Sequence, residues 1–275
     1  MAEETNLPAM CTAGVEQAVP PASAAKAAGV FSLLTAALLA SSVLLIAQST
    51  KPAMKAPKPS KPEAVSGGEI SGKVIFSGTP PKAKVLKMDA DPVCAAQHPT
   101  PVMSEDALIG PDGALQNVLV RVKAGLPASA IPPAPTTPVK IDQKGCIYTP
   151  RLVVAMVNQP VEFSNSDDTD HHIQAMAEVN KEWMVSQKKG TAPMTQTFDQ
   201  EEVGMLVICH LHPWMRMFIS VLKNPFYAIT GKDGTFSIKG LPPGYYTIEA
   251  WHERFGTQSL KVQAGDKADF TFKDE

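Results

Sequence analysis

Residues 204–222 read GMLVICHLHPWMRMFISVL and combine an alternating strand pattern with a dense set of metal donors. The strand pattern ends at Cys209, and His212 and then Met215 follow, each after two intervening residues. A loop this short can turn a thiolate, an imidazole and a thioether onto one ion. Soft sulfur donors stabilise Cu(I), and imidazole suits both oxidation states of copper. The segment therefore predicts a copper site on this loop.

A type 1 copper site needs a second imidazole, which must come from elsewhere in the chain. The upstream sequence SNSDDTDHHIQA is a turn-rich stretch that leads into a strand. Alternation along that strand places His171 and Ile173 on one face and His172 on the other. Since the isoleucine should face the core, we predict His171 as the second imidazole ligand, with His172 as the alternative. Met215 is preferred to Met217 as the axial ligand, and Met217 is expected to face the sandwich or its rim.

The metal loop also resembles that of a known family. CHLHPWMR is similar to the Cys-x-x-His-Pro-aromatic-Met-Arg loop of amicyanin-type cupredoxins, and the upstream histidine resembles the histidine of their His-Asn-Val segment. The resemblance implies an all-β, Greek-key sandwich with one type 1 copper ion and outer-sphere electron transfer. In this chain His172 stands where the family often has asparagine.

A longer resemblance covers roughly residues 67–272. The segments GCIYTP, NSDDTDHHI, HLHPWM, GKDGTFSIKGLPPGYYTIEAWHE and GTQSL are similar to bacterial plastocyanin-like proteins fused to a carboxypeptidase-regulatory-like (rhamnogalacturonan-lyase-domain-like) β-sandwich. Arg151 stands where these fused relatives often have histidine. The resemblance implies a second, smaller β-sandwich beside the copper domain.

Composition agrees with an all-β chain that has two small domains. The 275 residues include 18 glycines and 25 prolines, and short alternating segments rich in Val, Ile, Phe and Thr lie between them. Residues 80–88, PPKAKVLKM, are expected to form one of these strands. The copper domain is expected to be inserted in the smaller sandwich. The expected order is a disordered tail at 1–28, a transmembrane anchor or signal segment at 29–50, a Pro/Lys-rich linker at 51–66, the first part of the small sandwich at 67–125, the cupredoxin domain at 126–223, and the rest of the small sandwich at 224–275.

The N-terminal segment predicts a membrane attachment. Residues 30–47 are mostly apolar and uncharged over about 18 positions, the length at which a spanning helix becomes the default interpretation. Acidic residues precede this segment where a cleaved signal peptide would be basic, which favours an uncleaved anchor. Lysines follow the segment, and an excess of positive charge there would favour a cytoplasmic location for the folded domain. Large folded domains nevertheless translocate largely regardless of nearby charge. We expect a membrane-anchored protein with a periplasmic or other extracytoplasmic folded domain, or a secreted one if the segment is cleaved.

Two further cysteines, a group of aspartates and two residues of the metal loop also have predicted roles. Cys94 and Cys146 are an even pair outside the copper site and predict a disulfide in an oxidising compartment, with two separate buried thiols as the alternative. The aspartates at 167, 168 and 170 lack calcium-loop spacing and are expected to form a solvated turn. Pro213 and Trp214 flank a ligand imidazole and are expected to form a docking surface for a redox partner.

These features favour an electron carrier over other classes of protein. The edge of His212 is the expected electron port, and the donor and acceptor are expected to be redox proteins. With Lys and Arg numbering 25 against 27 for Asp and Glu, no basic surface suggests nucleic acid. A closed four-ligand site leaves no coordination position for catalysis, so we do not expect an enzyme. The alternatives are a copper storage or delivery module and a cell-surface carbohydrate-binding module with structural copper.

Overall fold

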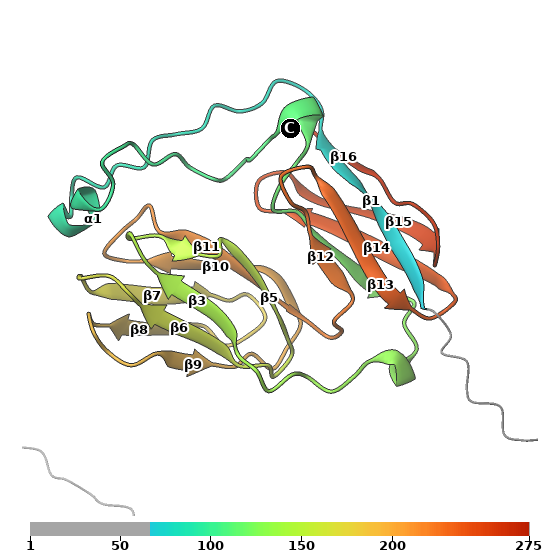
Figure 1. Ribbon diagram of the computed structural model, residues 1–275. Helices are drawn as coiled ribbons and strands as arrows, with labels where there is room; N and C mark the ends of the chain where they lie inside the picture. Colours follow the sequence, from blue (N-terminus) through green and yellow to red (C-terminus); the bar gives the residue numbers. More distant parts are fainter. Residues whose placement is uncertain (1–66, 275) are drawn as a thin grey trace, which may run out of the picture. The chain divides into compact units, whose positions relative to one another are not determined.

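The computed structural model describes residues 67–274, and within this range the chain is almost entirely β-strand (Figure 1). The expected all-β class is therefore confirmed for the described residues. The single α-helix in this range has five residues. The elements are β1 (Gly68–Phe76), α1 (Pro92–Ala96), η1 (Pro111–Gly113), β2 (Leu119–Ala124), η2 (Ala128–Ala130), β3 (Val139–Gln143), β4 (Tyr148–Thr149), β5 (Leu152–Met156), β6 (Val161–Asn165), β7 (His171–Met176), β8 (Trp183–Gln187), β9 (Met194–Gln196), β10 (Glu202–Cys209), β11 (Arg216–Leu222), β12 (Tyr227–Ile229), β13 (Thr235–Leu241), β14 (Tyr245–His252), β15 (Gly256–Gln263) and β16 (Phe270–Phe272).

Strands β3 to β11 form a two-sheet sandwich, which we call the central sandwich (residues 139–222). One sheet has the strand order β5-β11-β10-β7-β8 and the other β4-β3-β6-β9. The inward residues of each strand alternate with outward ones, as in β6, where Val161 and Phe163 are fully buried. The two sheets share one apolar core, to which β10 contributes Met205, Val207 and Cys209. The candidate cysteine therefore lies at the end of a core-facing row.

The remaining strands form a second, smaller sandwich, which we call the flanking sandwich (β1, β2 and β12 to β16). Its sheets have the orders β13-β1-β16 and β12-β2-β14-β15. β1 pairs antiparallel with β13 and parallel with β16, and β2 lies between β12 and β14. Strands from before and after the central sandwich thus complete the same sheets and bury a common apolar core.

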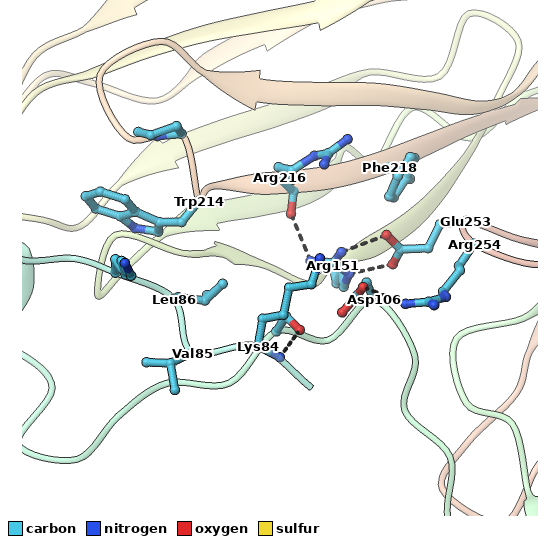
Figure 2. Close-up of a pocket in the computed structure, with 13 residues that line it drawn as sticks. Lys84, Val85, Leu86, Asp106, Arg151, Trp214, Arg216, Phe218, Glu253 and Arg254 are labelled. Atoms are coloured by element: carbon cyan, nitrogen blue, oxygen red, sulfur yellow. Dashed lines mark hydrogen bonds and ion pairs between the residues drawn. The ribbon is translucent and has the colours of Figure 1, made fainter. Parts of the chain in front are cut away.

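Apolar side chains and two ion pairs join the two sandwiches, and one of the pairs is Arg121–Glu201 at 2.7 Å. Phe218 of the central sandwich meets Trp251 of the flanking one edge to face, with ring centroids 5.4 Å apart. Nearby, Arg151 forms a two-pronged pair with Glu253, with Nε–Oε1 and Nη2–Oε2 distances of 2.6 and 2.7 Å (Figure 2). A bidentate pair of this kind fixes the relative orientation of the two side chains and also neutralises their charges. Arg151, at the position where histidine was the family expectation, therefore contributes to the interface.

Residues 84–103 form a segment that packs on the central sandwich, and we call it the cover segment. The expected strand at 80–88 is absent: only an isolated bridge between Val85 and Met103 forms there. Three lysines interrupt the apolar residues of this stretch. The stretch therefore lacks a continuous apolar face that a full strand could bury. Met88 and Cys94 of the segment are nevertheless buried in the core of the central sandwich. A disulfide between Cys94 and Cys146, as the sequence predicted, joins the segment to that sandwich.

The predicted anchor at 29–50, its preceding tail and the linker at 51–66 lie outside the described residues. Within residues 67–274 no helix is long and apolar enough to cross a membrane.

His252 is buried in the flanking sandwich as a neutral imidazole. It is 1% exposed and stacks on Phe255, with centroids 4.7 Å apart, while its Nδ1 accepts a hydrogen bond from the Arg254 amide. Burial and the nearby Arg151 charge lower the pKa of His252 to about 4. The unfolded chain therefore takes up a proton at this residue at higher pH than the folded chain does.

We predict that this histidine makes the protein less stable in acid. Stability from this group is complete above the unfolded pKa of 6.5 and is lost as pH falls toward 4. Between pH 7.5 and 5 the loss should be about 2 kcal/mol in the free energy of unfolding. Urea unfolding of the wild type, His252→Gln and the exposed-histidine control His210→Gln at both pH values measures it. The difference between pH values should shrink only in His252→Gln, and equal pH dependence in all three proteins would contradict the prediction.

Candidate metal centre

Three of the four predicted ligands are brought together by strand pairing and one tight loop. β7 and β10 are antiparallel neighbours, with Cys209 opposite Ile173, so the thiol lies close to His171 at the start of β7. After Cys209 the chain turns back sharply, and the Cys209 amide donates to the Met215 carbonyl while the Met215 amide donates to the His212 carbonyl. These bonds fold His212 over the strand end. Strand pairing thus unites donors that are 38 residues apart in sequence.

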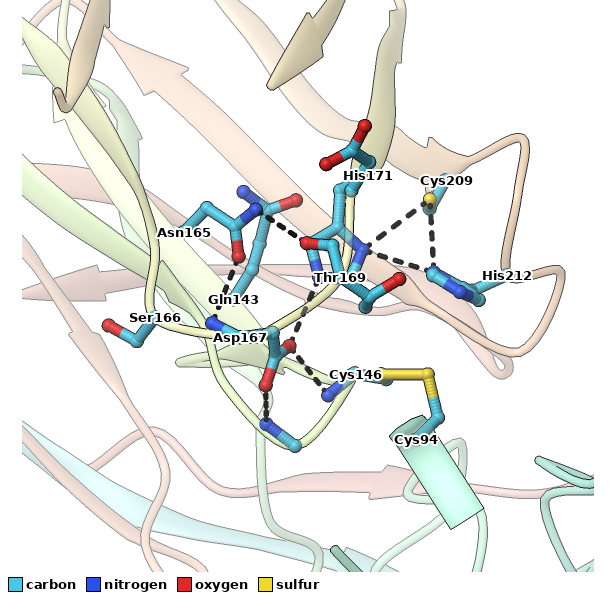
Figure 3. Close-up of polar contacts among 12 residues, drawn as sticks. Cys94, Gln143, Cys146, Asn165, Ser166, Asp167, Thr169, His171, Cys209 and His212 are labelled. Carbon is cyan, nitrogen blue, oxygen red and sulfur yellow. Dashed lines mark hydrogen bonds and ion pairs between the residues drawn. A yellow bond between two sulfur atoms is a disulfide. The ribbon is translucent and has the colours of Figure 1, made fainter. Parts of the chain in front are cut away.

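The donor atoms form a triangle in a closed space (Figure 3). The Sγ atom of Cys209 lies 3.9 Å from Nδ1 of His171 and 3.7 Å from Nδ1 of His212, and the two Nδ1 atoms are 3.0 Å apart. Bonds of about 2.0 Å to nitrogen and about 2.3 Å to sulfur place the donors around one ion roughly 3 to 4 Å apart. The triangle fits a single metal ion. The three residues are at most 3% exposed.

Met215 lies at the end of the same loop and is 1% exposed. A thiolate and two imidazoles, with a thioether available on the same loop, form a soft donor set that suits copper better than zinc or calcium. Met217 lies further along β11, opposite Val207, and is fully buried in the core. His172 is turned away from the triangle, and its ring lies against His210, with centroids 5.5 Å apart.

Two other groups of potential ligands lie near the triangle but are blocked by chemistry. Each includes Cys146, and one also includes Cys94. Both cysteines are consumed in the disulfide and cannot act as thiolates. Within the described residues, His171, Cys209 and His212 are therefore the group of His, Cys and acidic residues whose donors are all available to a metal.

A carboxylate holds the far nitrogen of each candidate imidazole. Nε2 of His171 is 3.0 Å from Asp167 Oδ2, and Nε2 of His212 is 2.9 Å from Asp91 Oδ2. A carboxylate accepts, so each Nε2 carries the proton and each Nδ1 presents its lone pair to a metal. The hydrogen bond also makes the imidazole a stronger donor.

Asp167 is itself fixed by several donors. The amides of Gly145 and Cys146 donate to its two oxygens at 2.6 and 2.8 Å, and Gln97 donates from its side chain. Burial alone would raise the pKa of Asp167, but the bonds from His171, the backbone and Gln97 lower it below the usual value. The expected solvated turn is therefore wrong for this residue, which is 5% exposed. Asp168, the next residue, does face solvent and pairs with Lys189.

The thiol of Cys209 is prepared to be a thiolate. Burial raises its pKa, but hydrogen bonding with His171 and with backbone amides, including that of His172 at 3.4 Å, lowers it to about 7. Burial by contrast lowers the pKa of the His171 imidazole, but the hydrogen bonds and charges of Asp167 and the Cys209 thiol raise that pKa to about 9. Without a metal, a proton on His171 therefore balances the thiolate, and a cation would take over that role.

The cover segment closes the site over His212. Asp91 begins α1 by accepting from the Val93 amide with Oδ1, and its Oδ2 accepts from Thr169 and faces His212. On its other side His212 lies against Trp214, with ring centroids 5.1 Å apart. The expected exposed edge is absent: His212 is 3% exposed and its Nε2 is occupied.

Sequence reasoning missed both carboxylates for different reasons. Asp167 precedes His171 by four residues in a turn, and this proximity was a usable signal. Asp91 lies 121 residues from His212 in the chain, in a segment without strand or helix periodicity. Only the Asp-Pro pair that begins α1, together with the nearby Cys94, could have marked this region as ordered.

Comparisons with known proteins give only weak matches. No family model and no curated protein matches the sequence. Among solved structures, a purple cupredoxin from Nitrosopumilus maritimus is 21% identical with a TM-score of 0.26, covering 30% of this chain and 98% of that one. A copper-containing nitrite reductase from Thermus scotoductus is 18% identical with a TM-score of 0.28, covering 54% of this chain and 28% of that one. An oxidised amicyanin variant is 17% identical with a TM-score of 0.28, covering 37% and 97%. Function must therefore be inferred from the donor set itself.

Proposed function

We propose that this protein is an electron carrier that holds one type 1 copper ion in a Greek-key, cupredoxin-type sandwich. The observation that carries the proposal is the buried triangle formed by Cys209 Sγ and the Nδ1 atoms of His171 and His212, with Met215 at the end of the same loop. Two imidazoles, one thiolate and a weak thioether are the donors of electron-transfer copper sites.

Copper bound there would supply a one-electron couple between Cu(II) and Cu(I). The task of the protein is to keep the donors in place while the charge changes. Asp167 and Asp91 hold both imidazoles by their outer nitrogens, and backbone amides hold the thiolate. Because these partners are themselves fixed by the fold, little needs to rearrange when an electron arrives.

The burial of the donors favours electron transfer over catalysis or copper delivery. Catalytic copper needs an open position for substrate, and a delivery site needs ligands that a partner can reach. Here His171, Cys209 and His212 are 0%, 2% and 3% exposed. Electrons can tunnel through such a wall, whereas substrates and competing ligands cannot cross it without movement.

The proposed setting is the outer face of a membrane. Residues 29–50 would anchor the chain and residues 51–66 would hold the folded part away from the lipid. The disulfide supports an oxidising compartment such as the periplasm. Redox proteins would be the donor and acceptor of electrons.

We predict that adding Cu(II) to the copper-free protein gives one bound copper per chain and an intense visible thiolate-to-copper band. Cys209→Ser should lose the band because the sulfur is the source of the transferred charge. His210→Gln, a change in the adjacent exposed imidazole, should keep it. Absorption spectra and metal analysis measure both. A colourless copper-loaded wild type, or a coloured Cys209→Ser, would overturn the proposal.

We predict that the two methionines differ in their effect on the reduction potential. Met215→Leu should raise the potential, because replacing a thioether donor by hydrocarbon favours the less charged Cu(I). Met217→Leu is a change of similar volume in the core and should leave the potential nearly unchanged. Protein-film voltammetry measures both potentials. A larger shift in Met217→Leu than in Met215→Leu would show that Met217, and not Met215, is the axial ligand.

We predict that the carboxylates behind the imidazoles lower the reduction potential. Asp167→Asn should weaken Cu(II) binding relative to Cu(I) by about 10- to 100-fold, which corresponds to a rise of about 60 to 120 mV for one electron. Asp91→Asn should cause a smaller rise, because its side chain is 20% exposed whereas that of Asp167 is fully buried.

Asp168→Asn is the matched control for this series. It changes the same charge in the same turn, but the Asp168 side chain is 82% exposed. Its potential should match the wild type after thermal unfolding has shown that all variants are folded. Equal shifts in the variants at 167 and 168 would show a general charge effect in place of a specific hydrogen bond.

A further inference from the structure

A cavity of about 580 Å³ lies beside the metal loop (Figure 2). Its walls come from the cover segment, the end of the metal loop and the flanking sandwich. Sites for small organic ligands range from about 300 to 1,000 Å³. The cavity is therefore of a size to hold a small molecule, whereas a docked protein would need a broader surface.

One wall of this cavity is apolar and aromatic. Trp214 and Leu86 line it near the metal loop, and Phe218 lines it near the flanking sandwich. The Trp214 indole N–H donates to the Cys146 carbonyl at 3.1 Å, which fixes the orientation of the ring. A fixed indole beside apolar side chains is a suitable stacking surface for an aromatic ring.

The charges around the cavity are mainly positive. Five cationic side chains and two carboxylates line it. Both carboxylates are already paired, Glu253 with Arg151 at 2.6 Å and Asp106 with Arg254 at 3.4 Å.

Three cations remain without such a partner. Within residues 67–274, the side chains of Lys84, Lys87 and Arg216 form no ion pair, and all three residues are exposed. A concave surface lined by one sign of charge concentrates ligands of the opposite sign. Unpaired cations together with an aromatic wall favour a ligand that is both aromatic and negatively charged.

The cavity also has a short connection to the candidate metal centre. Asp91 and the cover segment close off the edge of His212. Trp214 contacts His212 with ring centroids 5.1 Å apart and also lines the cavity. A ring stacked against Trp214 would therefore be separated from a metal donor by one side chain.

We propose that this cavity binds a small aromatic anion, and that a hydroquinone bearing an anionic group is the immediate electron donor. The second part rests on the proposed copper function. One electron would leave the hydroquinone and would reduce bound Cu(II) to Cu(I), while a phenolic proton would pass to solvent and a semiquinone would remain. Two semiquinones released to solvent then disproportionate to one quinone and one hydroquinone.

Binding is tested first in the copper-free full chain, by calorimetry with hydroquinone sulfonate. Wild type should bind it, and Lys84→Gln/Lys87→Gln should weaken binding by about five- to tenfold through loss of two exposed charges. Neutral methylhydroquinone should bind equally to both proteins. Lys239→Gln/Lys261→Gln, the same charge change at exposed positions of the flanking sandwich, should bind hydroquinone sulfonate like wild type.

Three binding outcomes would overturn the cavity proposal. They are no binding of the sulfonate, equal weakening in both double variants, and sulfonate binding that is unchanged in Lys84→Gln/Lys87→Gln. If the sulfonate does not bind but an acidic redox protein reduces wild type faster than this variant, the surface is a protein-docking site and the proposal fails.

The electron-transfer step is tested by stopped-flow bleaching of the copper-loaded protein. The reduction rate should saturate with hydroquinone sulfonate near the dissociation constant found by calorimetry and require about five- to tenfold more donor in Lys84→Gln/Lys87→Gln. A rate unaffected by this variant would overturn the donor role. Sulfonate binding without any visible copper band would defeat the proposed copper function while leaving the cavity intact. A visible band without sulfonate binding would defeat only the cavity proposal.

Discussion

The hydrogen bond between Asp167 and His171 is the interaction on which the geometry of the candidate site depends. It is made between two fully buried side chains, where an unpaired carboxylate would be costly. The cost is met because backbone amides of Gly145 and Cys146 also donate to the same carboxylate. The bond fixes the tautomer of the imidazole, so that Nδ1 points toward Cys209. One carboxylate thus links the loop after β3, the start of β7 and the end of β10.

The disulfide joins the cover segment to this same loop. Cys146 accepts the indole N–H of Trp214 through its carbonyl, gives its amide to Asp167, and is bonded to Cys94 through sulfur. It therefore contacts Asp167, the support of His171, and is bonded to the segment that carries Asp91, the support of His212. A disulfide between residues 52 positions apart lowers the conformational entropy of the unfolded chain. It therefore stabilises the folded arrangement in which the cover segment packs on the central sandwich. Leu86, Met88 and Val102 of the cover segment pack on the core of the central sandwich, and the disulfide adds a covalent link that holds the segment over the site.

The sequence was informative where chemistry and periodicity coincide. The all-β class follows from short alternating segments, and the Cys94–Cys146 disulfide from the count of cysteines. The metal loop was recognisable because its donors are close in sequence, and the preference for His171 over His172 came from strand alternation. The strand expected at 80–88 was wrong because three lysines interrupt the apolar residues that would form its buried face. Asp91 could not be predicted, since its role comes from a tertiary contact with a residue 121 positions away in the chain. Asp167 was misassigned because polar residues in a turn are usually solvated, and its burial depends on amides from another loop.

Burial of His212 changes how an electron could reach the site. With an exposed imidazole edge, any partner that fits the surface can approach the metal directly. Here Asp91 occupies that edge, and the protected imidazole is in contact with the indole of Trp214. In the proposed function, selectivity would then depend on the walls of the neighbouring cavity, where cations without an ion-pair partner and an aromatic surface would decide which donor approaches. In the proposed electron carrier, the same cover would keep water and competing ligands from the thiolate and would restrict electron entry to this cavity. Because Glu253 and Arg254 also line this cavity, the flanking sandwich would take part in the proposed recognition of the ligand.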